Sequence, residues 1–250
     1  MTEKDRKTPT DVASYYEKYW SSEGFSPFGS MYPELERLLL RHVRPGAACL
    51  DVGCGDGRTA GLWLQNHGCD YLGVDVSTAA VEMARSIGLK AQAIEAATSL
   101  PFADEAFDMV LCLEVFEHLF EPHVAAAELL RVLRPGGVLV ASVPNTAYWR
   151  RRAELAVIGR WDPIGDTLSV AQPWRDPHIR FFTPATLRRM LELAGYVNVE
   201  VGGHGGAFLR DLPWVGSRVR SWNVSSVYDR AQRAFPDLLA LRLSAVATKG

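Results

Sequence analysis

Residues 50–57 read Leu-Asp-Val-Gly-Cys-Gly-Asp-Gly, and Gly-Val-Asp-Val-Ser follows at residues 73–77. Small apolar residues at the first stretch predict a buried strand over 47–52. The glycines after it predict a turn that exposes backbone N–H groups to a ligand at the start of the next helix. Asp75 falls at the tip of the next expected strand, where a carboxylate can accept hydrogen bonds from both hydroxyls of a ribose. A tight turn without a ligand is the alternative, but the pairing of the two stretches favours a nucleoside-binding crevice.

The acidic residue Asp51 distinguishes between nucleoside ligands. A dinucleotide would bring a pyrophosphate to this turn, and a carboxylate there would repel it. S-adenosylmethionine (SAM) carries an ammonium group that Asp51 would attract, and a carboxylate that would face the N–H groups of the turn. The spacing Gly-x-Gly-x-Gly also differs from the dinucleotide form Gly-x-Gly-x-x-Gly. We therefore expect SAM as the cofactor.

At this point the chain resembles the class I SAM-dependent methyltransferases, over about residues 46–200. Four segments carry the resemblance in the family's order: LDVGCGDGR (50–58), GVDVS (73–77), LPFADEAFDMVLCLEVFEHL (100–119) and LRPGGVLVASVPN (133–145). The later segment RFFTPATLRRMLELAGY (180–196) and the basic, aromatic stretch after VPN are similar to the subgroup that acts on small metabolites, sugars, lipids and quinones.

Strands and helices alternate along the 250 residues. This alternation predicts an α/β fold, a doubly wound and mostly parallel Rossmann-like sheet. The expected strands are 47–52, 70–75, 89–94, 107–113, 137–143, 196–201 and 240–248, and the helices between them are 58–67, 78–87, 122–132 and 184–194. The resemblance implies seven strands with the last one antiparallel. Residues 1–45 are expected to form a disordered tail and a helical cap, and residues 46–250 a SAM-binding domain with insertions 144–182 and 202–238 over the active site.

The resemblance implies a set of cofactor contacts along the carboxyl edge of the sheet: Asp51, Gly53, Cys54, Gly55, Gly57, Asp75, Val76, Glu95, Ala96, Leu113 and Glu114. In the family, a residue at the position of Glu95 accepts a hydrogen bond from the adenine amino group; an exposed loop carboxylate is the equal alternative. Backbone at Leu113 would pack on the methionine part of SAM, and Glu114 would contact the methionine end or the acceptor.

Two histidines are the candidates for catalysis. Methyl transfer mainly requires alignment and exclusion of water, but a hydroxyl acceptor also calls for a general base. His178 is the first candidate because its segment enters the cap side, with a hydrogen-bonded structural histidine as the alternative. His118 either organises its loop or acts as a base. No His, Asp or Glu cluster has metal-ligand spacing, so we expect no metal.

Aromatic and basic residues predict the acceptor pocket: Tyr19, Trp20, Asn145, Tyr148, Trp149 and Arg152. Residues after 144 would supply apolar walls and a cationic group for a carboxylate or phosphate. The alternative is a solvated helix face with aromatic rings packed beneath it. The cap aromatics either close over SAM or bury themselves against the edge of the sheet.

Composition limits the class of acceptor. The net charge of −2 and the lack of an Asn-Pro-Pro-aromatic motif argue against nucleic acid as a partner. The four cysteines form no CxxC pair, and no signal peptide or transmembrane run is visible, so a cytoplasmic protein without membrane insertion is expected. The expected function is methylation of an oxygen, hydroxyl or carboxylate, of a secondary metabolite, lipid or sugar. An N-methyltransferase of an amine or amino sugar and a non-catalytic SAM-binding protein are the alternatives, and a homodimer stays open.

Overall fold

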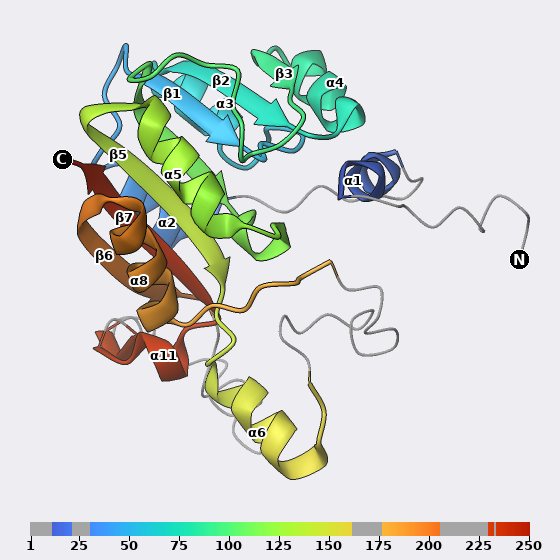
Figure 1. The fold of residues 1–250 in the computed structure, drawn as a ribbon, viewed down its shortest axis with the longest axis vertical. Helices are drawn as coiled ribbons and strands as arrows, with labels where there is room; N and C mark the ends of the chain where they lie inside the picture. Colours follow the sequence, from blue (N-terminus) through green and yellow to red (C-terminus); the bar gives the residue numbers. More distant parts are fainter. Residues whose placement is uncertain (1–11, 22–30, 162–176, 206–229, 233) are drawn as a thin grey trace, which may run out of the picture.

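The computed structural model of the chain describes residues 12–21, 31–161, 177–205, 230–232 and 234–250. The expected N-terminal tail and parts of both expected insertions lie outside the described residues. A seven-stranded sheet with the order β3-β2-β1-β4-β5-β7-β6 forms the centre (Figure 1). Its strands are Ala48–Val52 (β1), Asp70–Asp75 (β2), Ala91–Ala93 (β3), Phe107–Leu113 (β4), Leu133–Pro144 (β5), Tyr196–His204 (β6) and Arg242–Lys249 (β7).

Strands β1 to β5 pair in parallel, and β7 runs antiparallel to both β5 and β6. This arrangement confirms the predicted seven-stranded Rossmann-like sheet with an antiparallel last strand. The order of the strands reverses at β1, because β2 and β3 lie on one side of it and β4 on the other. Ligands of such sheets bind outside the carboxyl ends of the strands at this reversal. The crevice is therefore expected beyond the ends of β1, β2 and β4.

Helices cover both faces of the sheet. The chain forms helices Val12–Trp20 (α1), Pro33–Leu39 (α2), Gly61–Asn66 (α3), Thr78–Ser86 (α4), Pro122–Val132 (α5), Trp149–Ile158 (α6), Pro184–Ala194 (α8) and Pro236–Leu239 (α11), and a short 3₁₀ turn at Phe116–His118 (η2). Buried side chains of α5 and α8 pack on one face, and those of α2, α3 and α4 on the other. Strand β4 contributes to both layers, with Val110 on the α5 side and Leu111 on the α3 side.

Two helices coincide with their predicted ranges because their ends carry strong local signals. Helix α5 begins with Pro122, and α8 begins after Thr183, whose side chain accepts a hydrogen bond from the N–H of Thr186. Helix α8 ends before Gly195, which adopts a positive φ of 103°. The helix predicted to start at residue 58 begins instead at residue 61, because the glycine turn extends through the intervening residues.

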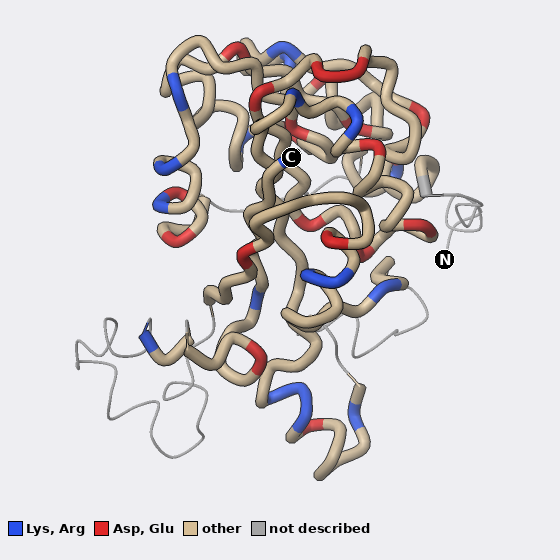
Figure 2. The backbone as a smooth tube through the Cα atoms, turned by 60° about the vertical axis from the view of Figure 1, so that its left-hand side comes forward, with Lys and Arg blue, Asp and Glu red and all other residues tan. Residues whose placement is uncertain are grey.

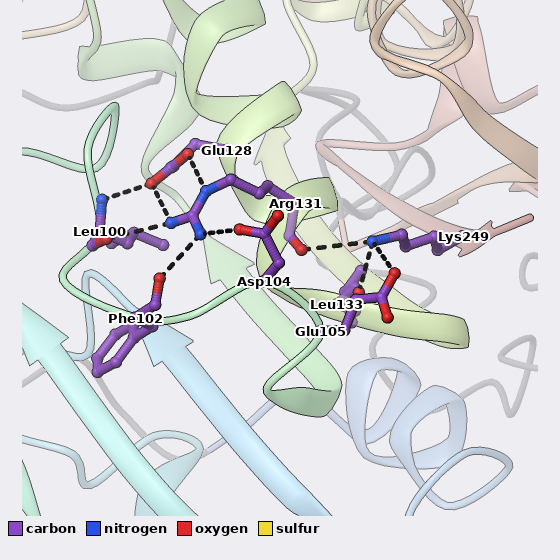
Figure 3. Close-up of polar contacts among 8 residues, drawn as sticks. All are labelled: Leu100, Phe102, Asp104, Glu105, Glu128, Arg131, Leu133 and Lys249. Atoms are coloured by element: carbon purple, nitrogen blue, oxygen red, sulfur yellow. Dashed lines mark hydrogen bonds and ion pairs between the residues drawn. The ribbon is translucent and has the colours of Figure 1, made fainter.

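A network around Arg131 fastens α5 to the loop that leads into β4 (Figure 3). The guanidinium donates to Asp104 at 2.6 Å and to Glu128 at 2.7 Å, and it also reaches the backbone carbonyl of Phe102 at 2.8 Å. Nearby, Lys249 of β7 donates to the carbonyl of Leu133 at 2.8 Å. These contacts lie at the amino end of β4, on the edge opposite to the expected crevice. They hold the scaffold and leave the carboxyl edge to other side chains.

Candidate functional site: the carboxyl edge of the sheet

The turn after β1 has the backbone geometry that only glycine adopts without strain. Gly53, Gly55 and Gly57 have φ values of 74°, 55° and 73°. An ideal Cβ on Gly53 would lie 2.4 Å from a methyl group of Val115, the residue before η2. The turn therefore lies directly against the segment that follows β4. Two segments separated by about sixty residues thus meet at one end of the crevice.

The carboxylate of Asp75 organises this turn. Its two oxygens accept hydrogen bonds from the backbone N–H groups of Gly55 and Ser77, each at 2.9 Å. The side chain is buried, and burial raises the pKa of Asp75 although these N–H groups oppose the shift. Carboxylate oxygens have further lone pairs, so Asp75 can also receive the ribose hydroxyls predicted for it. Val76, predicted to contact the cofactor, follows it and is half-buried.

Asp51 is buried within β1 beneath the turn. Its Oδ2 accepts a hydrogen bond from the hydroxyl of Tyr71 at 3.1 Å, and only 3% of the residue is exposed. Burial raises the pKa of Asp51 to about 7. A cationic ligand would reverse this shift, because an opposite charge favours the ionised form. The environment therefore suits an ammonium group. Cys54 is half-buried in the same turn, and burial raises the pKa of its thiol.

Helix α1 lies over this edge, beyond the arrowheads of β1 and β2 (Figure 1). Its Glu17 accepts hydrogen bonds from the Ser77 hydroxyl at 2.8 Å and from the Ala79 N–H at 3.2 Å, at the start of α4. Trp20 is buried against the glycine turn, and the ring of Tyr19 meets it edge-on at 5.7 Å. The two cap aromatics among the residues predicted for the acceptor pocket therefore lie beside the glycine turn. Their predicted contact with an acceptor stays a prediction.

The residue directly after β4 has an uncommon backbone conformation. Glu114 has a φ of 57°, which is uncommon for a residue other than glycine and is found preferentially at functional sites. Its carboxylate accepts hydrogen bonds from Ser142 at 2.8 Å and from Arg242 at 3.2 Å. Burial raises the pKa of Glu114 to about 7. Leu113 precedes it at the predicted methionine position. Sequence reasoning found Glu114 but neither of its two partners.

The structure brings both candidate catalytic histidines together. The rings of His118 and His178 lie 4.4 Å apart between centroids. Both flank Glu117, whose Oε1 is 3.7 Å from Nε2 of His118 and 4.0 Å from Nε2 of His178. The segment that carries His178 is fastened here because Ile179 and Arg180 donate their N–H groups to the backbone carbonyl of Glu117, at 2.9 and 3.0 Å. Burial raises the pKa of the Glu117 carboxyl.

The residues predicted for adenine lie further along the edge. Glu95 and Ala96 follow β3, where Ala96 forms an isolated bridge with Ser99. The side chain of Glu95 is exposed. An exposed position after β3 is compatible with both alternatives for Glu95, a contact with adenine and a loop carboxylate. The choice between them stays a prediction.

The residues predicted for the acceptor after β5 occupy different environments. Asn145 is buried, and its amide donates to the carbonyls of Ala240 at 2.7 Å and Pro236 at 3.0 Å, so it fastens α11 to the end of β5. Tyr148 is buried at the start of α6, Trp149 is half-buried, and Arg152 is exposed. Contact of these four residues with an acceptor stays a prediction.

Comparisons with known proteins agree with the fold. Residues 50–141 match the family model described as "Methyltransferase domain". The ubiquinone biosynthesis O-methyltransferase of Idiomarina loihiensis is 27% identical over 81% of this chain and 85% of its own length. The 2-methyl-6-phytyl-1,4-hydroquinone methyltransferase of Synechocystis sp. is 35% identical over 45% of this chain, which spans only 35% of that relative. Proteins named tRNA methyltransferases are also among the relatives.

The fold has solved counterparts. A SAM-dependent methyltransferase from Archaeoglobus fulgidus superposes with a TM-score of 0.60, at 19% identity, over 96% of this chain and 100% of the other. The strand order and the flanking helices define a Rossmann-like α/β fold. Residues 50–141 form a methyltransferase domain, so the protein is a SAM-dependent methyltransferase with the class I Rossmann-like fold, and its cofactor is SAM.

Proposed function

We propose that the protein transfers the methyl group of SAM to an oxygen, hydroxyl or carboxylate, of a small acceptor such as a secondary metabolite, lipid or sugar. The observation that carries the proposal is the cluster of Glu117, His118 and His178 beside the glycine turn. Val115 packs against Gly53, so the cluster begins two residues from the point where the methionine end of SAM is proposed to bind. A hydroxyl must lose its proton to become a good nucleophile, and a cluster of this chemistry can assist that loss.

The ubiquinone relatives support oxygen as the acceptor atom, because they align over most of both chains and are named O-methyltransferases. Neither a carboxylate nor a neutral amine needs deprotonation before transfer, so the cluster has a catalytic use only with a hydroxyl acceptor, and an N-methyltransferase would leave it without one. A non-catalytic SAM-binding protein would equally leave it without a use. These two alternatives predict that variants of the cluster change no reaction.

A small acceptor is favoured over nucleic acid by the charge of the chain. Figure 2 shows basic and acidic residues interspersed along the described backbone rather than separated by sign. Nucleic-acid binding usually draws on a basic patch or stripe. Among the described residues, none of the helices could span a lipid bilayer. A cytoplasmic location is part of the proposal, supported by four cysteines that are all free.

Mass spectrometry tests the proposal directly. The protein is incubated with SAM and a panel of phenols, carboxylic acids, sugars and amines, and methylated products are sought together with demethylated SAM. Transfer to a hydroxyl or carboxylate is expected, with losses of tenfold or more in His118→Asn and His178→Asn for hydroxyl acceptors. His123→Asn is the matched control because His123 is exposed on α5. Transfer to amines alone, or SAM binding without any transfer, would refute it.

A further inference from the structure

The three side chains of the cluster have the arrangement of metal ligands. One atom from each of Glu117, His118 and His178 can be chosen so that all three lie within 4.8 Å of one another. Two ligand atoms about 2.1 Å from a tetrahedral metal are about 3.4 Å apart. The separations of 3.7 and 4.0 Å between the Glu117 carboxylate and the two imidazoles are slightly wider. Small side-chain movements would therefore place all three atoms on one ion.

The carboxylate of Glu117 lacks the partners that burial normally demands. Only 1% of the residue is exposed, yet neither carboxylate oxygen accepts a hydrogen bond from the described part of the chain. A buried carboxylate without such partners is costly, and buried charges are generally paired or coordinate metals. The hydroxyl of Tyr16, whose ring meets that of His118 at 5.5 Å, is likewise buried without a partner among the described residues. The Glu117 oxygens and the Tyr16 hydroxyl can therefore each take a polar ligand.

The histidine His118 is oriented for ligation. Its Nδ1 lies 3.3 Å from the backbone carbonyl of Pro177. A carbonyl only accepts hydrogen bonds, so Nδ1 donates to it, and in the neutral imidazole Nε2 then carries the lone pair on the side of Glu117. Metal-ligating histidines commonly donate their second N–H to such a carbonyl. The backbone hydrogen bonds from residues 179 and 180 to Glu117 keep His178 at the same place.

We propose that Glu117 and the Nε2 atoms of His118 and His178 bind one divalent transition-metal ion. Two imidazoles and one carboxylate suit such an ion, and three protein ligands leave coordination positions open. Glu114 is not required, because its oxygens already accept from Ser142 and Arg242. This site reverses the expectation of no metal. That expectation rested on spacing, and His178 is sixty residues away from His118.

The chemistry of the ion rests on the proposed O-methyl transfer. When bound, such an ion would make an acceptor hydroxyl at an open position easier to deprotonate, and the proton would pass to solvent. A lone pair of that oxygen then attacks the methyl carbon of SAM. The new O–C bond forms as the C–S bond breaks, and the bonding electrons stay on sulfur, which becomes a neutral thioether. Both imidazoles act as ligands in this scheme, so neither removes the proton.

Metal binding is measured without any acceptor, which separates this proposal from the proposed function. The full chain, purified without a histidine tag, is stripped with EDTA, dialysed and titrated calorimetrically with Mn²⁺ and with Zn²⁺. One ion per chain is expected for at least one of the two metals. Glu117→Gln and His178→Asn should each weaken binding tenfold or more, and His123→Asn should leave it unchanged.

SAM affinity and circular dichroism of each variant report whether it is folded. A folded Glu117→Gln variant that binds both metals as tightly as the wild type would overturn the site, and so would the absence of binding of either metal to the stripped wild type. If binding fails while the histidine variants still lose transfer to hydroxyls, the cluster acts directly as a base, and the proposed function stands without the metal.

Discussion

The indole of Trp20 occupies the space that a side chain on Gly55 would need. An ideal Cβ at Gly55 would lie 2.6 Å from Cζ2 and 2.7 Å from Cη2 of that ring. Helix α1 therefore lies on the glycine turn itself, and the turn and the helix constrain each other. A substitution at either residue is expected to affect both.

Gly55→Ala should destabilise the fold and weaken SAM binding together. The variant combines an unfavourable φ of 55° with the contact to Trp20, which predicts a loss of about 1–3 kcal/mol in the free energy of unfolding. Gly88→Ala is the matched control, since Gly88 has a φ of 87° and no atom near its ideal Cβ. Urea unfolding and SAM calorimetry measure both effects. Equal losses of stability in the two variants would show that the contact with Trp20 contributes nothing.

Glu17→Gln should loosen α1 from the start of α4. The carboxylate accepts from Ser77 and from the N–H of Ala79 at the helix N-terminus, where negative charge is favourable. We expect faster amide hydrogen exchange in α1, with the sheet unaffected. Lys18→Gln, at an exposed position of the same helix, should leave exchange unchanged. Identical amide hydrogen exchange in the Glu17 variant and the wild type would mean that Trp20, and not Glu17, holds α1 against the sheet edge.

Asp75→Ala should reduce SAM affinity by about tenfold or more, because the ribose loses its carboxylate and the turn loses the acceptor for two N–H groups. Calorimetry with SAM measures the loss. Asp70→Ala changes the same residue type at the exposed start of β2 and should bind SAM normally. Unchanged affinity in the Asp75 variant would place the ribose elsewhere.

SAM binding should strengthen as the pH rises through about 7. Burial raises the pKa of Asp51 to about 7, so below that pH the carboxyl is protonated and cannot attract the ammonium group. The stability of the free protein should change in the opposite direction: the raised pKa favours folding below the unfolded pKa, and this contribution is lost between about pH 4 and about pH 7. Calorimetry between about pH 6 and pH 8 tests the binding. Asp51→Asn should bind more weakly and lose this dependence; a wild type with pH-independent affinity would contradict the assignment.

The sequence predicted the fold well where signals are local. Strand β4 and helices α5 and α8 have their expected bounds, since hydrophobic period, prolines and Gly195 mark their ends. The predicted start of helix α3 was wrong by three residues. A glycine turn of this length cannot be told from a helix N-terminus by composition, because its conformation depends on contacts with Val115 and Trp20.

The proximity of Asp75 to the glycine turn could be predicted from spacing along the chain, whereas the meeting of Glu117, His118 and His178 could not. Asp51 and Asp75 stand at fixed distances along the chain from the glycines, so spacing reports their proximity. His118 and His178 were each named from the sequence, but their meeting with Glu117 depends on how residues 177–180 return to η2. Burial of Asn145 is likewise a tertiary property, because its partners lie about ninety residues later.

Strand β7 lies between β5 and β6 in the sheet, although it follows both in the sequence and is translated last of the three. In the sheet, β6 pairs with β7 and with no other strand of the described chain. On the ribosome, β6 and α8 therefore emerge with no partner strand to complete their side of the sheet, and closure waits for residues 242–249. Arrest of translation shortly before residue 242 should leave β6 sensitive to protease in the nascent chain. Release of the later residues should protect it in a single late step.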